Sequence, residues 1–275
     1  MIRGLYTAAS GMLLGLRQQE VVADNLANSN TVGYKADQSA QTAFAGVLAR
    51  RVGASDGPMR GSTDQVIGMV GTGAFVQNVR TFLGQGSERE TGSPLDVMLR
   101  GDGFFVVETD DGVRYTRDGH WDRDDQERLV TSDGGMVLDL QGTPIVVDTD
   151  HLRIKPDGRI MRLVSTPIES ADGSTVLDVT EEEVAQLQVV TLSADDLVRA
   201  GQSQFMVVPG GVVTPMDPAE GVTFVLQGSL EEANVNVGQS ATSLYSVARS
   251  YSSSQRVFSA INDTLESAVR EVGRV

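Results

Sequence analysis

Apolar side chains repeat with heptad spacing at both ends of this 275-residue chain. Such a stripe occupies one narrow face of a helix, and that face needs another helix to cover it. The C-terminal stripe consists of Leu244, Val247, Tyr251, Ser254, Phe258, Ile261, Leu265, Ala268 and Val272, with Ser254 as its one clearly polar break. The N-terminal stripe consists of Leu5, Ala9, Met12, Leu16, Gln19, Ala23 and Leu26, with Gln19 as its polar break. We therefore predict two terminal helices that pack together within one molecule or between several.

Both helices are predicted to depend on packing rather than on their own helix propensity. Gly11 and Gly15 each weaken the first helix by about 1 kcal/mol relative to Ala. The second helix contains many Ser residues, which favour other backbone conformations. Helices of this kind are marginal in isolation. Our hypothesis is that the termini become ordered when subunits assemble.

From Ala74 onward the pattern changes to short alternating apolar runs, which are typical of β-strands. Pairs such as Asp111-Gly112, Asp133-Gly134 and Asp157-Gly158 separate these runs, and Asp-Gly is a strong hairpin signal. No alternation of strands with helices is visible in this region. The predicted fold class is α+β, a predominantly antiparallel β domain with N- and C-terminal helices that form a coiled-coil-like helical domain.

The same patterns predict three parts along the chain. Residues 1–35 and 235–275 form the terminal helical domain, residues 36–73 form an extended connector, and residues 74–234 form the antiparallel β domain. Within the connector, residues 38–51 are compatible with a short helix. Residues 53–73 are rich in Gly, Ser and Asp, and we expect them to be extended.

Composition narrows the classes of function. The formal net charge is −15, which argues against nucleic acid as a partner. The near-neutral terminal segments remain free to pack against copies of themselves. The chain has no Cys, so disulfides and thiolate metal sites are excluded. No apolar run reaches the ~18–20 residues of a membrane span, and residues 4–16 are too polar for a cleaved signal peptide.

The sequence offers no convincing chemical site. Gly71-Thr72-Gly73 lacks the third glycine of a dinucleotide-binding loop. The acidic run 122–127 has Glu127 where a calcium loop requires Gly. His120 and His151 have no partner at metal-ligand spacing, and Trp121 is expected to pack in the core or against a hairpin. We predict no catalytic, cofactor-binding or metal-binding residues, and no enzyme activity.

One segment after the first helix carries a distinctive motif. Its members are Asn25, Leu26, Ala27, Asn28, Asn30, Thr31, Gly33, Tyr34 and Lys35. Further blocks follow in order at 91–97, 101–107, 115–119, 129–134 and 227–235. Together these blocks resemble the bacterial flagellar axial proteins of the rod and hook family. The second helix departs from the family pattern at residues 242–245, although Gln255-Arg256 is retained.

The resemblance implies a structural subunit of the flagellar basal-body rod, which polymerises into a helical tube that transmits torque from motor to hook. The implied partners are copies of the chain, neighbouring rod and hook proteins, and the flagellar type III export apparatus, with no nucleic acid and no direct membrane span. The implied location is the basal body in the cell envelope, reached without a cleaved signal peptide. Proximal and distal rod types stay open. The alternatives are a hook-type axial component or a secreted β-rich adhesin or enzyme.

The helix stripes supply the predicted assembly interface. Its residues are Leu5, Ala9, Met12, Leu16, Ala23, Leu26, Leu244, Val247, Tyr251, Phe258, Ile261 and Leu265.

Overall fold

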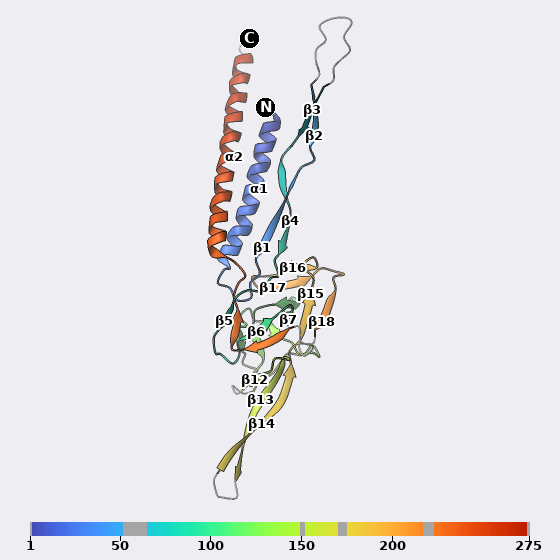
Figure 1. Cartoon of the computed structure of the whole chain (residues 1–275), viewed down its shortest axis with the longest axis vertical. Coiled ribbons are helices and arrows are strands. Elements are labelled where there is room, and N and C mark those ends of the chain that lie inside the picture. Colours follow the sequence, from blue (N-terminus) through green and yellow to red (C-terminus); the bar gives the residue numbers. More distant parts are fainter. Residues whose placement is uncertain (1, 52–64, 149–151, 170–174, 217–222, 274–275) are drawn as a thin grey trace. The chain divides into compact units, whose positions relative to one another are not determined.

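A computed structural model describes residues 2–51, 65–148, 152–169, 175–216 and 223–273 (Figure 1). The chain divides into two compact units. The first contains residues 1–26, 37–80 and 237–275, and the second contains residues 27–36 and 81–236. The boundaries between these units differ from the predicted boundaries at residues 35, 73 and 234. Residues 27–36 belong with the β domain, and most of the predicted connector belongs with the helices.

The first unit contains two helices, α1 (Ile2–Ala27) and α2 (Val237–Val272), which pack together as predicted. They run antiparallel, because Gly4, Gly11 and Gly15 of α1 face Ile261, Ser254 and Tyr251 of α2 in turn. A Cβ atom added at Gly4 would lie 3.0 Å from the Ile261 side chain, and one at Gly11 would lie 3.1 Å from Ser254. Glycine at these positions therefore lets the helices approach closely.

The first unit also contains two pairs of strands. β1 (Asp37–Ala43) pairs with β4 (Ala74–Thr81), and β2 (Val47–Arg51) pairs with β3 (Gln65–Val70). The short helix considered for residues 38–51 is therefore wrong. Exposure alternates from residue to residue between Asp37 and Ala40, as along a strand, and the alternation shifts by one at Gln41. Residues 38–51 lack the 3.6-residue apolar period of an amphipathic helix, so their sequence fits paired strands better than a helix.

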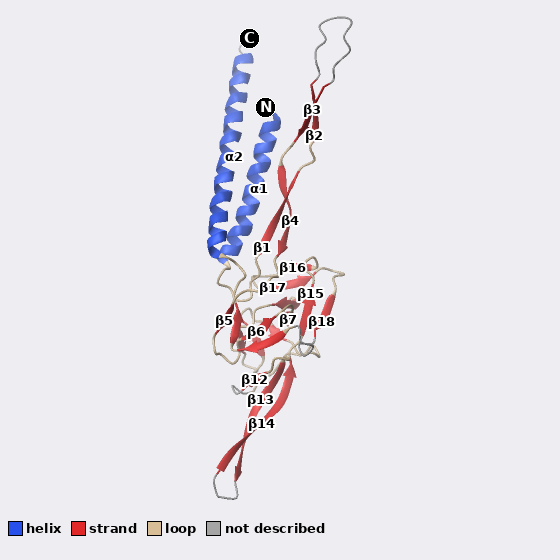
Figure 2. Ribbon diagram, in the orientation of Figure 1, coloured by secondary structure: helices blue, strands red, loops and turns tan. Residues whose placement is uncertain are grey.

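The second unit is built on a nine-stranded antiparallel sheet (Figure 2). Its main path has the order β16-β17-β8-β7-β11-β10-β9, and β15 joins β7 to β18. The strands are β7 (Phe104–Thr109), β8 (Gly112–Thr116), β9 (Trp121–Arg123), β10 (Leu129–Thr131), β11 (Met136–Val137), β15 (Val189–Leu192), β16 (Leu197–Arg199), β17 (Gln204–Val207) and β18 (Val213–Met216).

Three smaller sheets complete the second unit. They contain β12 (Leu152–Ile154), β13 (Arg159–Glu169) and β14 (Thr175–Gln186); β5 (Glu88–Glu90) with β20 (Ser229–Glu231); and β6 (Val97–Arg100) with β19 (Phe224–Gln227). The predicted Asp-Gly turns are found between β7 and β8, β10 and β11, and β12 and β13. Gly134 and Gly158 adopt φ of 81° and 79° there, a conformation that favours glycine.

The core of the second unit lies on both faces of β7. Phe105 and Val107 pack with Trp121 on one face, whereas Phe104 and Val106 pack with Phe205 on the other. Trp121 is 1% exposed, and its ring centroid lies 4.9 Å from that of Phe105 in an edge-to-face arrangement. The core role expected for Trp121 is therefore confirmed.

Candidate functional site

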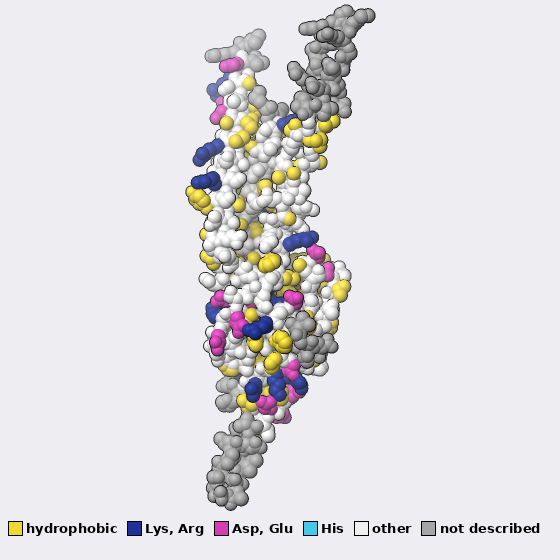
Figure 3. All heavy atoms as spheres, in the orientation of Figure 1, with side chains coloured by type: hydrophobic (Ala, Val, Ile, Leu, Met, Phe, Trp, Pro, Cys, Tyr) yellow, Lys and Arg dark blue, Asp and Glu magenta, His cyan; other side chains and the backbone are white. Residues whose placement is uncertain are grey.

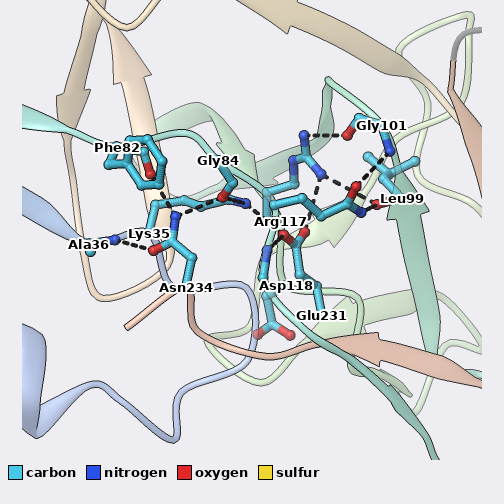
Figure 4. Close-up of polar contacts among 12 residues, drawn as sticks. Lys35, Ala36, Phe82, Gly84, Leu99, Gly101, Arg117, Asp118, Glu231 and Asn234 are labelled. Atoms are coloured by element: carbon cyan, nitrogen blue, oxygen red, sulfur yellow. Dashed lines mark hydrogen bonds and ion pairs between the residues drawn. The ribbon is translucent and has the colours of Figure 1, made fainter. Parts of the chain in front are cut away.

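The motif segment and the C-terminal end of the second unit meet in a buried set of polar side chains (Figure 4). We call Lys35, Arg117, Glu231 and Asn234 the polar joint. Lys35 comes from the loop after α1, Arg117 follows β8, Glu231 ends β20, and Asn234 precedes α2. Residues nearly 200 positions apart in the sequence thus lie side by side. All four belong to the second unit.

Glu231 is the centre of the polar joint. Its Oε1 atom accepts hydrogen bonds from Lys35 Nζ at 2.6 Å and from the Gly86 backbone N–H at 2.7 Å. Its Oε2 atom accepts one from Arg117 Nη1 at 3.1 Å. The side chains of Lys35 and Glu231 are each 1% exposed, and that of Arg117 is 3% exposed. One carboxylate therefore pairs with two buried cations, and the charge of Asp102 favours both of them further.

Burial shifts the pKa values of both cations in the same direction. Burial lowers the pKa of Lys35, and the neighbouring Glu231 carboxylate opposes the shift. Burial likewise lowers the pKa of Arg117, again opposed by Glu231. Backbone carbonyls hold both cations further, since Lys35 Nζ donates to Gly84 O at 3.0 Å and Arg117 Nη2 donates to Gly101 O at 2.8 Å. The cluster is thus ordered by charge and by hydrogen bonds together.

Asn234 joins three parts of the chain through its amide group. The Ala36 backbone N–H donates to Asn234 Oδ1 at 2.7 Å. Asn234 Nδ2 donates to Phe82 O at 2.8 Å and to Gly84 O at 2.7 Å. Ala36 precedes β1, Phe82 follows β4, and Asn234 precedes α2. Residues 36, 82 and 234 each lie close to a position where the chain crosses from one unit to the other. The Asn234 side chain therefore holds these three crossing segments together on the side of the second unit.

Gly33 is required where the motif segment crosses β20. Its N–H donates to Glu231 O at 2.8 Å, and its φ is 67°. A Cβ atom at Gly33 would lie 2.4 Å from the Arg117 carbonyl carbon and the Asp118 nitrogen. Next to it, Tyr34 is 2% exposed under the Arg199 guanidinium, which lies 4.5 Å above the ring centroid. No other residue type fits the space at Gly33.

The start of the motif has a separate role in the first unit. Asn25 is buried near the end of α1. Its Nδ2 atom donates to Asp37 O at 2.7 Å, and its Oδ1 atom accepts from Asp37 N at 2.8 Å. The amide thus pairs with the backbone as a neighbouring strand would. Asn28 and Thr31 form the turn between, Leu26 is half-buried, and the remaining members, Ala27 and Asn30, are exposed.

Three family models match successive regions of this chain. They are "Flagella basal body rod protein" at residues 5–35, "Flagellar hook protein FlgE/F/G D1 domain" at 98–162 and "Flagellar basal body rod FlgEFG protein C-terminal" at 226–271. Together they match about half of the chain. The chain belongs to the flagellar basal-body rod and hook family. Each matched region contributes to the polar joint: Lys35 from the first, Arg117 from the second, Glu231 and Asn234 from the third.

Similarity to curated members extends over the whole chain of this rod-family protein. The flagellar hook-basal body complex protein FlhO of Bacillus subtilis is 28% identical over 291 residues, covering 100% of both chains. The basal-body rod protein FlgG of the same organism is 28% identical and covers 98% of each. FlgF of Mesorhizobium japonicum is 28% identical, covering 98% of this chain and 97% of its own. The protein is a structural axial component of the basal-body rod, not an enzyme.

The predicted α2 stripe faces α1 in this rod-family protein. Its interface members Leu244, Val247, Tyr251, Phe258, Ile261 and Leu265 are all half-buried, whereas most residues between them are exposed. On α1 the contact surface is displaced by one residue. Gly4, Ala8, Gly11 and Gly15 lie one position before the predicted Leu5, Ala9, Met12 and Leu16.

The predicted α1 residues therefore flank the contact with α2. Leu5, Ala9, Met12 and Leu26 are half-buried, Leu16 is 44% exposed and Ala23 is exposed. Sequence reasoning did not assign roles to Arg117, Glu231 or Asn234. In the sequence, these three residues stood out only as members of blocks 115–119 and 227–235, which resemble the family. No local pattern marks side chains that contact each other over 100 residues apart.

The described residues contain no group of three or more His, Asp or Glu side chains that could bind a metal ion. Nor does either helix, over its described length, have a stretch apolar and long enough to cross a membrane. His151 lies outside the described residues.

His120 is expected to titrate above its ordinary pKa. Its Nδ1 atom lies 2.7 Å from Asp96 Oδ1, and this hydrogen bond raises the His120 pKa, with smaller contributions from Asp122 and Asp118. A raised folded-state pKa gives stability that is complete below the unfolded pKa and is lost as the pH rises through the folded pKa. NMR titration of the ring should show this. Asp96→Asn should lower the pKa more than Asp122→Asn does; equal effects would contradict the assignment.

Proposed function

We propose that this chain polymerises with copies of itself and with neighbouring rod and hook proteins into the helical tube of the rod. In that tube it would transmit torque from the motor to the hook. The observation that carries this proposal is the incomplete burial of α2. The helix is 36 residues long, and none of its described side chains is fully buried. A half-covered heptad face gains free energy when a neighbouring subunit covers it.

Other surfaces of the first unit support the same proposal. Tyr6 and Leu13 of α1 are each 67% exposed, and Tyr245 and Val269 of α2 are 68% and 70% exposed. Figure 3 shows hydrophobic side chains at the surface of the first unit, beside several charged side chains along α2. Residues 38–48 and 68–79 of the paired strands carry no charge. Such surfaces let copies of an acidic chain approach one another.

The proposed interface comprises the helix stripes. On α2 these residues are Leu244, Val247, Tyr251, Phe258, Ile261 and Leu265, and on α1 they are Leu5, Ala9, Met12, Leu16, Ala23 and Leu26. Because the α1 residues flank the contact with α2, they are placed to meet a second subunit. A non-closing, head-to-tail relation between subunits would continue such contacts into a tube.

The proposal includes export through the flagellar type III apparatus without a cleaved signal. Lys35 is buried in the polar joint, and Gly4, Gly11 and Gly15 face α2. Cleavage anywhere in this region would remove part of the packed structure. The N-terminal segment is therefore better explained as a permanent part of the subunit than as a removable leader.

Leu16→Asp is expected to prevent rod assembly while the second unit stays folded. A covered Leu contributes about 1.5–3 kcal/mol, so its loss raises the concentration needed for assembly at least about tenfold. Complementation of a deletion strain, with electron microscopy of basal bodies and circular dichroism of the purified chain, measures both effects. Phe258→Asp should act alike, whereas Ala260→Asp, on an exposed position of the same helix, is the matched control.

Two experimental outcomes would contradict the proposal. Basal bodies with intact rods in the Leu16→Asp or Phe258→Asp strain would exclude the stripes as the interface. A motile deletion strain with complete basal bodies would exclude the rod function itself.

A further inference from the structure

We infer that residues 223–234 act as the closing segment of the second unit, without which its buried core and charges cannot be completed. This inference concerns how the subunit reaches its folded state, and it does not depend on the proposed polymer. It rests on three kinds of contact, made by strands, by side chains and by buried charges.

The closing segment supplies the strand partners of β5 and β6. Among the described residues, β6 pairs with β19 and β5 pairs with β20, each as a two-stranded sheet. Val225 of β19 is 1% exposed and belongs to the same core cluster as Val97 and Leu99 of β6. Without the segment, β5 and β6 lose the hydrogen bonds of these two ladders, β6 keeps only bonds such as that from Val97 N to Gly119 O, and the main core is open along one side.

Side chains of the closing segment connect further parts of the unit. Thr223 Oγ1 donates to Asp102 O at 2.6 Å. Gln227 Nε2 donates to Pro94 O at 2.8 Å and to Leu152 O at 3.1 Å, and its Oε1 accepts from the Ile154 N–H at 3.1 Å. The segment therefore links the loops on either side of β6 to strand β12.

The buried charges make closure conditional on Glu231. Lys35 and Arg117 are buried beside this one carboxylate, which also accepts from the Gly86 N–H. Burying the two cations without it is unfavourable, because the buried charges then have no carboxylate in contact with them. Until Glu231 arrives, Lys35 and Arg117 are therefore more stable in contact with water. The loops that carry them then stay apart.

Closure is consequently a late step. The Glu231 contacts with Arg117 and Lys35 span 114 and 196 residues. Contacts between such distant residues form slowly, whereas the hairpin of β7 and β8 is local. A chain that is still being synthesised lacks the closing segment, so its second unit stays open until residues 223–234 have been added.

Pulsed hydrogen exchange during refolding of the full chain from denaturant, read by mass spectrometry, tests this inference. We expect amides of β5 and β6 to gain protection in the same kinetic phase as β19 and β20, after β7 and β8. Protection of β6 in an earlier phase than β19 would overturn the inference.

A matched pair of variants tests the role of the charge. Glu231→Gln should slow the closing phase at least about tenfold, and a chain that protects β7 and β8 but never β5 and β6 would also support the inference. Glu232→Gln, at the next residue with a side chain 46% exposed, should leave the phase unchanged. Equal rates for the two variants would overturn the role of Glu231.

Discussion

Glu231→Gln is expected to lower the free energy of unfolding of the second unit by about 3–5 kcal/mol. The substitution removes the one carboxylate that contacts Lys35 and Arg117, and both cations stay buried. The amide of Gln can still accept from the Gly86 N–H, so the loss arises from charge rather than from shape. Denaturant unfolding followed by Trp121 fluorescence measures it directly. Trp121 is the only Trp in the chain and lies in the core of the same unit.

Two further variants show whether charge is the cause. Glu232→Gln changes an exposed neighbour, and its effect should stay within about 0.5 kcal/mol. Lys35→Met leaves one cation paired with one carboxylate, so it should cost clearly less than Glu231→Gln despite the lost hydrogen bonds. A loss below about 1 kcal/mol for Glu231→Gln would contradict the account, since an uncompensated buried charge costs more than that.

Gly33→Ala is expected to destabilise the second unit by about 2–5 kcal/mol. The φ of 67° strains any residue with a Cβ atom, and that atom would overlap the backbone at Arg117 and Asp118 at 2.4 Å. The backbone cannot rotate away as a side chain can. The hydrogen bond from Gly33 N to Glu231 O would also be displaced. The same fluorescence-detected unfolding measures the loss.

Gly134→Ala is the control that separates the cost of backbone strain from the cost of steric overlap at Gly33. Gly134 has a φ of 81°, and nothing lies within 4 Å of the position a Cβ atom would take there. This variant should cost only the backbone strain of about 1–2 kcal/mol. If Gly33→Ala costs no more than Gly134→Ala, the close approach of the motif segment to Arg117 is not a constraint on the sequence.

The sequence predicted the elements whose signals are local. Heptad spacing revealed α2 and the residues that face α1, and Asp-Gly pairs marked several hairpins. The face of α1 predicted to contact α2 was one residue away from the observed face, because Gly4, Gly11 and Gly15 make the contact. An apolar pattern highlights large side chains, and close helix packing here depends on small ones.

The polar joint could not be predicted in this way. Lys35 and Glu231 are 196 residues apart, and a charged residue in a loop is ordinarily exposed. Nothing local distinguishes Glu231 from Glu232, although one is 1% exposed and the other is on the surface. Gly33 and Lys35 were identified only as members of a family motif. Their physical roles became visible when the fold brought the three matched regions together.

Hydrogen exchange of the free chain and of assembled rods tests the central claim most directly. The account holds that the polar joint belongs to the folded subunit, whereas the helices need neighbours. Residues 31–36 and 229–234 should therefore be protected in both states, and α1 and α2 should gain most of their protection on assembly. Helices as strongly protected in a proven monomer as in the rod would contradict the account, as would a polar joint that exchanges freely in the monomer.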